Sequence, residues 1–234
     1  MILEAHNLSF CYHRDAPPVL HDINLSLSSN ERVGLAAPSG SGKTTLCRLL
    51  AGYERPATGE ILLDGEPLYP KRRHLRSNAQ GHGRGAQYAP VQMIWQHPEM
   101  AVNPRLRMRE TIAEGGLIEP RVLHGLGIKS EWMNRFPGEL SGGELQRFCI
   151  ARSLGEQTKF LLADEITTML DLITQAQIWS FLLDEVQMRD IGLLVVSHSE
   201  ALLRHVCTRT HTLDATQSSC VTDCDATSET AQSW

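Results

Sequence analysis

The chain has 234 residues, of which 41% are hydrophobic, so it can bury a proper core and is not expected to be disordered as a whole. Its formal net charge of −5 does not provide the broad positive field that non-specific nucleic-acid binding requires, so neither DNA nor RNA is an expected partner. No apolar run approaches the ~18 residues of a membrane span, and the first residues, MILEAHNLSF, lack the pattern of a signal peptide, so we expect a soluble, cytoplasmic protein.

The first third of the chain is predicted to be mostly strands. A helix is expected over residues 45–51, where Gly52 ends it, directly after a glycine-rich loop. Apolar alternation and short apolar runs mark the strands, and the last of them enters an Asp64–Gly65 turn. The predicted strands are residues 2–10, 23–27, 32–36 and 59–68.

Strands and helices alternate in the remainder. Residues 70–90 are basic and glycine-containing with no apolar period, which indicates a surface loop. Strands are expected at 91–95, 160–163 and 191–196, and helical segments at 107–135, where glycines and prolines interrupt the pattern, at 144–154 and around 178–186. This alternation predicts an α/β fold with a largely parallel sheet and helices on its faces. The polar segment 214–234 is expected to be a disordered tail.

The first chemical signal is APSGSGKTT, between a predicted strand and a predicted helix. In this setting the backbone N–H groups of residues 39–43 can surround the β- and γ-phosphates of a nucleotide, whereas the alternative reading is an accidental turn. Lys43 would bridge phosphate oxygens, and the Thr44 hydroxyl would bind Mg²⁺. The predicted nucleotide-binding residues of this loop are Ala37, Pro38, Ser39, Gly40, Ser41, Gly42, Lys43, Thr44 and Thr45.

The loop departs from the usual pattern at Ala37, where a glycine is expected. Because Ala37 precedes Pro38, its backbone is biased to extended angles that alanine adopts without strain. We therefore expect the loop to close despite the methyl group.

The second signal is FLLADE, an apolar strand that ends in Asp164 and Glu165. Carboxylates at the carboxyl ends of strands face the crevice where ligands bind in open α/β sheets. Asp164 would hold Mg²⁺ through its water shell, and Glu165 would polarise the water that attacks the γ-phosphate. The alternative is a solvated acid pair at a strand end.

The third signal is LSGGELQR, residues 140–147, at the start of a predicted helix. Taken alone, Ser-Gly-Gly before a helix is a cap and a candidate anion site. The stretch resembles the signature motif of the ATP-binding cassette (ABC) ATPases. The resemblance implies that Ser141, Gly142, Gly143 and Glu144 bind ATP held by the phosphate loop of a facing protomer, so that hydrolysis requires a dimer.

Four further positions match the same family and take their roles from the resemblance. Tyr12 would stack on adenine, with an ordinary strand-edge tyrosine as the alternative. Gln96 would sense Mg²⁺ and the γ-phosphate and couple to the membrane subunit. Asp171 would contact the opposing phosphate loop. His198 would contact the γ-phosphate, although a histidine after a strand is more often structural.

Within the family the chain resembles the peptide and nickel importer branch, and within it the nickel-import ATPases. The stretches that carry this likeness are WQHPEMAVNPR, NRFPGELSGGELQRFCIARSL and MLDLITQAQIW. The chain departs from the branch in a shortened interval between Gln96 and Leu140, an insertion at 71–90 and a missing C-terminal segment. Cys220 and Cys224 in the tail are expected to be free thiols rather than metal ligands.

The resemblance implies an ABC-type phosphate-loop NTPase domain over residues 1–213, with an antiparallel β-subdomain and a small helical subdomain at about 97–155. Its cofactors would be ATP and Mg²⁺. Its partners would be two transmembrane permease subunits, a second ATPase protomer, identical or paralogous, and indirectly a solute-binding protein. The expected function is ATP-driven import of nickel, a nickel chelate or short peptides, from the inner face of the cell membrane.

Two alternatives remain open from the sequence. A soluble ABC ATPase could act in a non-transport complex, but such proteins usually carry two cassettes or a coiled-coil insertion, and neither is present. A regulatory module could bind nucleotide without turnover, but Glu165 and His198 argue against it.

Overall fold

The structure is a computed structural model that describes residues 1–13, 16–38, 40–68, 90–213 and 221–222. Ser39, nearly all of the predicted surface loop and insertion, and most of the predicted tail therefore lie outside the described residues. Among the described helices, none is both long enough and apolar enough to cross a membrane.

A four-stranded antiparallel sheet forms the N-terminal part. Its strands are β1 (Ile2–Phe10), β2 (Leu20–Ser28), β4 (Thr58–Leu63) and β5 (Glu66–Pro67), in the order β2-β1-β4-β5. Leu3 of β1 lies opposite Leu27 on one side and Leu63 on the other, so apolar residues share one face. This sheet is the predicted antiparallel β-subdomain.

A six-stranded sheet forms the centre of the molecule, in the order β10-β9-β3-β8-β7-β6. All its pairs are parallel except that of β9 with β10. The residues of β7 and β8 are buried throughout, as expected when helices or another sheet cover both faces. Its strands are β3 (Arg32–Ala36), β6 (Val91–Ile94), β7 (Phe160–Asp164), β8 (Gly192–Val196), β9 (Arg209–Thr212) and β10 (Val221–Thr222).

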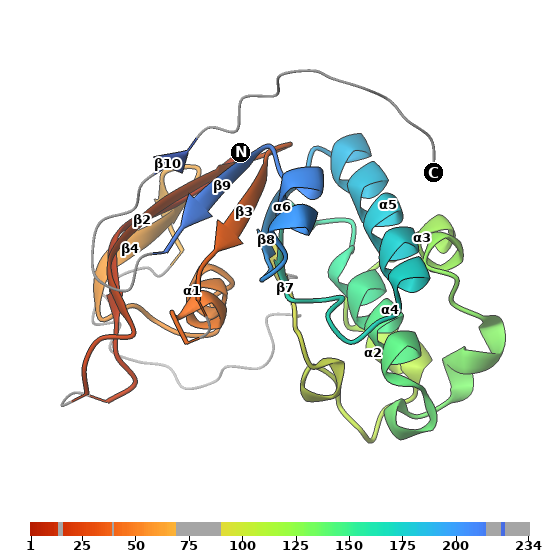
Figure 1. Ribbon diagram of the computed structural model, residues 1–234. Helices are drawn as coiled ribbons and strands as arrows, with labels where there is room; N and C mark the ends of the chain where they lie inside the picture. The colour runs from red at the N-terminus through yellow and green to blue at the C-terminus, as the bar shows by residue number, and fades with distance from the viewer. Residues whose placement is uncertain (14–15, 39, 69–89, 214–220, 223–234) are drawn as a thin grey trace, which may run out of the picture.

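Each face of the central sheet has its own hydrophobic cluster. One cluster joins it to the antiparallel sheet and to α1 (Lys43–Leu50). The other joins it to the helical part, which Figure 1 shows on the opposite side of the molecule from β2 and β4. That part contains α2 (Met108–Ala113), α3 (Pro120–Gly125), α4 (Gly142–Ser153), α5 (Leu172–Met188), α6 (Glu200–Val206) and the short 3₁₀ turns Pro98–Met100, Ser130–Asn134 and Pro137–Glu139.

The predicted α/β fold is confirmed, with small differences at element ends. Helix α1 begins two residues before its predicted start because Gly42, with a φ of 89°, turns the chain directly into Lys43. Helix α4 likewise begins at Gly142 because Ser141 caps it. The sequence did not predict α6 or β9. Within the predicted tail, Val221–Thr222 pairs with β9.

Candidate functional site

The carboxyl ends of β3, β6, β7 and β8 meet at one edge of the central sheet, because these strands are parallel neighbours. A cavity of about 500 Å³ lies there, and we call it the phosphate-loop cavity. It brings together the predicted site residues of four separate segments. Its lining residues are Val19, Gly40, Gly42, Lys43, Thr44, Thr45, Gln96, Glu165 and His198.

The loop before α1 is shaped by two glycines with left-handed backbones, Gly40 at a φ of 79° and Gly42 at 89°. A Cβ on Gly42 would also lie 2.8 Å from Leu20 and 3.0 Å from the carbonyl oxygen of Val19. Only glycine satisfies both constraints. The loop therefore packs directly on the start of β2.

Lys43 is folded against the loop that it follows. Its ammonium Nζ donates to the carbonyl oxygens of Ala37 at 2.7 Å and Pro38 at 2.8 Å. The side chain is therefore held at the cavity wall, where it can present its positive charge to an anion. Ala37 does not have a positive φ, so its backbone conformation is one that alanine adopts without strain, as predicted.

Thr44, which lines the phosphate-loop cavity, is hydrogen-bonded to Asp164, which does not itself line that cavity. The Thr44 Oγ1 hydroxyl donates to Asp164 Oδ2 at 2.7 Å, although the two residues are 120 positions apart in the chain. Asp164 is 3% exposed, and this burial raises the pKa of its carboxyl against the opposing effect of the Thr44 hydrogen bond. A hydroxyl and a carboxylate in contact are oxygen donors of the kind that Mg²⁺ prefers.

Glu165 lies between the two other polar side chains of the cavity. Its Oε1 is 2.6 Å from His198 Nε2, and its Oε2 accepts a hydrogen bond from Gln96 Nε2 at 3.2 Å. Its own φ is 50°, in the left-handed region that non-glycine residues adopt at a cost on the order of 1 kcal/mol. This backbone angle directs the carboxylate away from the buried strand β7 and into the cavity.

Tyr12 reaches the phosphate-loop helix from the end of β1. Its hydroxyl shares a hydrogen bond with Thr45 Oγ1 at 3.0 Å, and its ring packs edge-on against Phe10 with 4.9 Å between centroids. Tyr12 as a whole is 48% exposed, and it does not line the cavity. A half-exposed, anchored aromatic face beside the loop can stack on a planar base.

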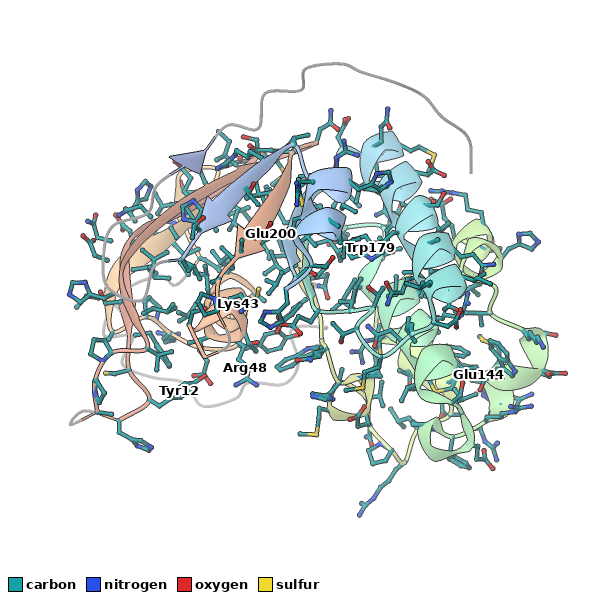
Figure 2. The ribbon with its side chains drawn as sticks, viewed as in Figure 1. Tyr12, Lys43, Arg48, Glu144, Trp179 and Glu200 are labelled. Carbon is teal, nitrogen blue, oxygen red and sulfur yellow. The ribbon has the colours of Figure 1, made fainter. Side chains whose placement is uncertain are left out.

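Four of the remaining predicted residues, Ser141, Gly143, Glu144 and Asp171, line a second cavity of about 540 Å³, which we call the signature cavity. Ser141 and Glu144 lie at its edge and form a capping box, in which Ser141 N donates to Glu144 Oε2 at 2.8 Å. Asp171 caps α5 by accepting from Thr174 N at 3.0 Å, and this backbone hydrogen bond lowers the pKa of the Asp171 carboxyl. Figure 2 shows Glu144 on the helical side of the molecule, away from Lys43.

Not every predicted residue lines a cavity. Gly142 does not line the signature cavity, and the other described residues of the prediction that line neither cavity are Tyr12, Ala37, Pro38, Ser41 and Asp164. The structure also adds residues that the sequence did not indicate. Val19 joins the phosphate-loop cavity, whereas Lys129, Trp132, Arg147, Thr174 and Gln177 join the signature cavity. Arg147 ends the stretch LSGGELQR, and Thr174 and Gln177 lie within MLDLITQAQIW, whereas Val19, Lys129 and Trp132 stand in no stretch that the sequence singled out.

Comparisons with known proteins agree with this arrangement. The family described as ABC transporter matches residues 20–168. The nickel import ATP-binding protein NikE of Escherichia coli (strain K12) is 36% identical over 208 residues, which cover 84% of this chain and 75% of that protein. NikE of Brucella suis biovar 1 (strain 1330) is 35% identical over 228 residues, which cover 92% and 82%.

Solved structures show the same fold. The dimeric structure of MJ0796, a bacterial ABC transporter cassette, superimposes with a TM-score of 0.73 at 21% identity, covering 91% of this chain and 94% of that one. A bacterial Atm1-family ABC exporter with ATP bound gives 0.72 at 23% identity, covering 92% and 37%. With the family match and the two cavities, these likenesses establish that the chain belongs to the ABC transporter family and is one of its ATP-hydrolysing cassettes.

Proposed function

We propose that this chain is the ATP-hydrolysing subunit of an ABC importer and works as one half of a dimer that encloses ATP between two protomers. The observation that carries the proposal is the separation of the phosphate-loop residues and the signature residues into different cavities. A triphosphate that touches both sets would therefore have to lie between two chains.

In the phosphate-loop cavity, Lys43 and the loop amides bind the phosphates of ATP, and Tyr12 stacks on the adenine. Thr44, Asp164 and Gln96 supply oxygen atoms for Mg²⁺, with Asp164 acting through the water shell. The hydroxyl–carboxylate contact of 2.7 Å already places two of these donors together. When bound, Mg²⁺ neutralises charge that develops on the phosphate oxygens.

Glu165 is the general base that takes a proton from the attacking water. Its carboxylate is aimed into the cavity, and its side chain is only 11% exposed, so few water molecules compete for it. His198 and Gln96, which contact the two oxygens of that carboxylate, hold it in place and contact the γ-phosphate. The three side chains act as one unit.

A second ATPase protomer, identical or paralogous, completes each site. Ser141, Gly142, Gly143 and Glu144 bind the γ-phosphate on the facing loop through the first turn of α4, whose N-terminus favours anions. Asp171 contacts that loop. ATP thus favours the closed dimer, whereas ADP with phosphate does not, and the difference in binding drives the cycle.

The direction of transport rests on the relatives, which are named for nickel import. The chain would sit on the inner face of the cell membrane beneath two permease subunits, with a solute-binding protein delivering nickel, a nickel chelate or a short peptide. Gln96 is followed by the turn Pro98–Met100, in which Met100 is exposed, and would couple the site to the permease.

A purification from detergent-solubilised membranes tests this proposal. Tagged protein should recover two hydrophobic permease subunits, and deletion of the gene should abolish uptake of radioactive nickel or of a labelled short peptide. Recovery of ribosomes or of a soluble enzyme complex, with uptake of both solutes intact, would replace the importer by a non-transport ATPase.

A further inference from the structure

Trp95 directly follows β6 and directly precedes Gln96. It contacts both α1, which begins at the phosphate-loop cavity, and α4, which begins at the signature cavity. Its ring packs against Tyr53 with 5.3 Å between centroids, and the guanidinium of Arg48 lies over the ring at 5.0 Å. Arg48 belongs to α1, the helix that starts at Lys43, and Figure 2 shows both residues on it. The ring is thus attached to the phosphate-loop helix.

The backbone of Trp95 is held from the other side. Its carbonyl oxygen accepts a hydrogen bond from Gln146 Nε2 at 3.3 Å. Gln146 lies in α4, the helix that starts with the signature motif, and is only 2% exposed. Its Oε1 has no hydrogen-bond partner among the described residues. The hydrogen bond from Nε2 to Trp95 therefore satisfies only the nitrogen end of this buried amide.

This hydrogen bond also orients the peptide group that joins Trp95 to Gln96. The carbonyl of Trp95 and the N–H of Gln96 belong to one planar peptide group, so holding the oxygen fixes the plane from which the Gln96 side chain projects. Gln96 Nε2 then donates to Glu165 Oε2 at 3.2 Å. A shift of α4 would therefore turn the peptide group and change the contact between Gln96 and Glu165.

We propose that Gln146 and Trp95 are positioning residues, which hold Gln96 against Glu165 and make the alignment of that carboxylate depend on the position of α4. Binding of the signature motif to an ATP on the facing chain would thereby change the position of Glu165 in the phosphate-loop cavity of the same chain. The proposal rests on the proposed function in taking Glu165 as the base.

A double-mutant cycle on the permease-assembled protein tests this. Gln146→Met keeps the length of the side chain but removes the donor, and should lower kcat for ATP by about tenfold, the scale of one lost buried hydrogen bond. KM for ATP should change by less than about twofold, since the contacts of Lys43 are untouched. In a Gln96→Ala background the same substitution should change kcat by less than about twofold, because its route of action is gone.

A tenfold loss that persists in the Gln96→Ala background would overturn the proposal, as would an unchanged kcat in Gln146→Met. Gln187→Met, on the exposed side of α5, is the matched control. If Gln146→Met lowers the folded fraction by circular dichroism, kcat is expressed per folded molecule in every member of the cycle, and the same two outcomes apply. Failure of the proposed function is read separately, from full turnover in Glu165→Gln.

Discussion

Glu165→Gln is the substitution that separates catalysis from binding most cleanly. Glutamine has the shape of glutamate, so its oxygen can still accept from Gln96 at a separation near 3.2 Å and its amide can still face His198. What is lost is the charge and the ability to take a proton. Loss of a general base lowers turnover by roughly 10²-fold or more, which corresponds to about 2.7 kcal/mol on the barrier.

The assay measures phosphate release by the permease-assembled protein at saturating Mg-ATP, together with ATP affinity from equilibrium binding of a fluorescent analogue. Turnover should fall by at least about 10²-fold while affinity stays within about twofold of the wild type. Glu60→Gln, which removes an exposed carboxylate from β4, should leave both quantities unchanged. Undiminished turnover in Glu165→Gln would refute the assignment of this residue as the base.

Three other substitutions test separate parts of the account. Lys43→Ala should abolish both ATP binding and hydrolysis in the same assays, and retained affinity would contradict the phosphate-loop assignment. Tyr12→Phe, which keeps the ring but loses the hydroxyl, should raise KM for ATP by only a few-fold, about 1 kcal/mol for one hydrogen bond, whereas Tyr12→Ala should raise it more; equal effects would remove the stacking role. Asp164→Asn should abolish Mg²⁺-dependent turnover yet raise Tm at neutral pH, because burial raises the pKa of this carboxyl and its charged form therefore destabilises the folded state. The Tm difference between Asp164→Asn and the wild type should shrink as the pH falls through the raised pKa of Asp164 towards the ordinary pKa of aspartate. A Tm difference that grows as the pH falls would show that the pKa of Asp164 is not raised.

The predicted site residues that the structure brings together stand mostly in contiguous motifs. The loop APSGSGKTT and the strand FLLADE each carry their chemistry within a few positions, and their flanking apolar runs predict the strands that place them. The parallel order of β3, β8, β7 and β6 then brings Lys43, Gln96, Glu165 and His198 to one edge, as alternating strands and helices predict.

The rest depends on contacts between distant segments. Strand β9 reads RTHT, with no apolar alternation, and becomes a strand because it pairs with β3; its His211 is buried among neighbours that the sequence does not specify. Val19 enters the phosphate-loop cavity because Gly42 allows a close approach that no local pattern shows. The hydrogen bond from Gln146 to Trp95 spans 51 positions and likewise has no sequence signal.

In the proposed dimer, the loop of one chain and the signature motif of a facing chain enclose one triphosphate. This enclosure is tested by adding Ser141→Arg to the Glu165→Gln chain and measuring two quantities with and without it. One is the ATP affinity of the isolated chain. The other is ATP-driven dimerisation, measured for the chain with itself and with the ATPase chain that co-purifies. We expect ATP affinity in the isolated chain to stay within about twofold, because Ser141 lies outside the phosphate-loop cavity, while dimerisation is lost. Loss of affinity in the isolated chain, or normal dimerisation with ATP, would contradict the proposed dimer.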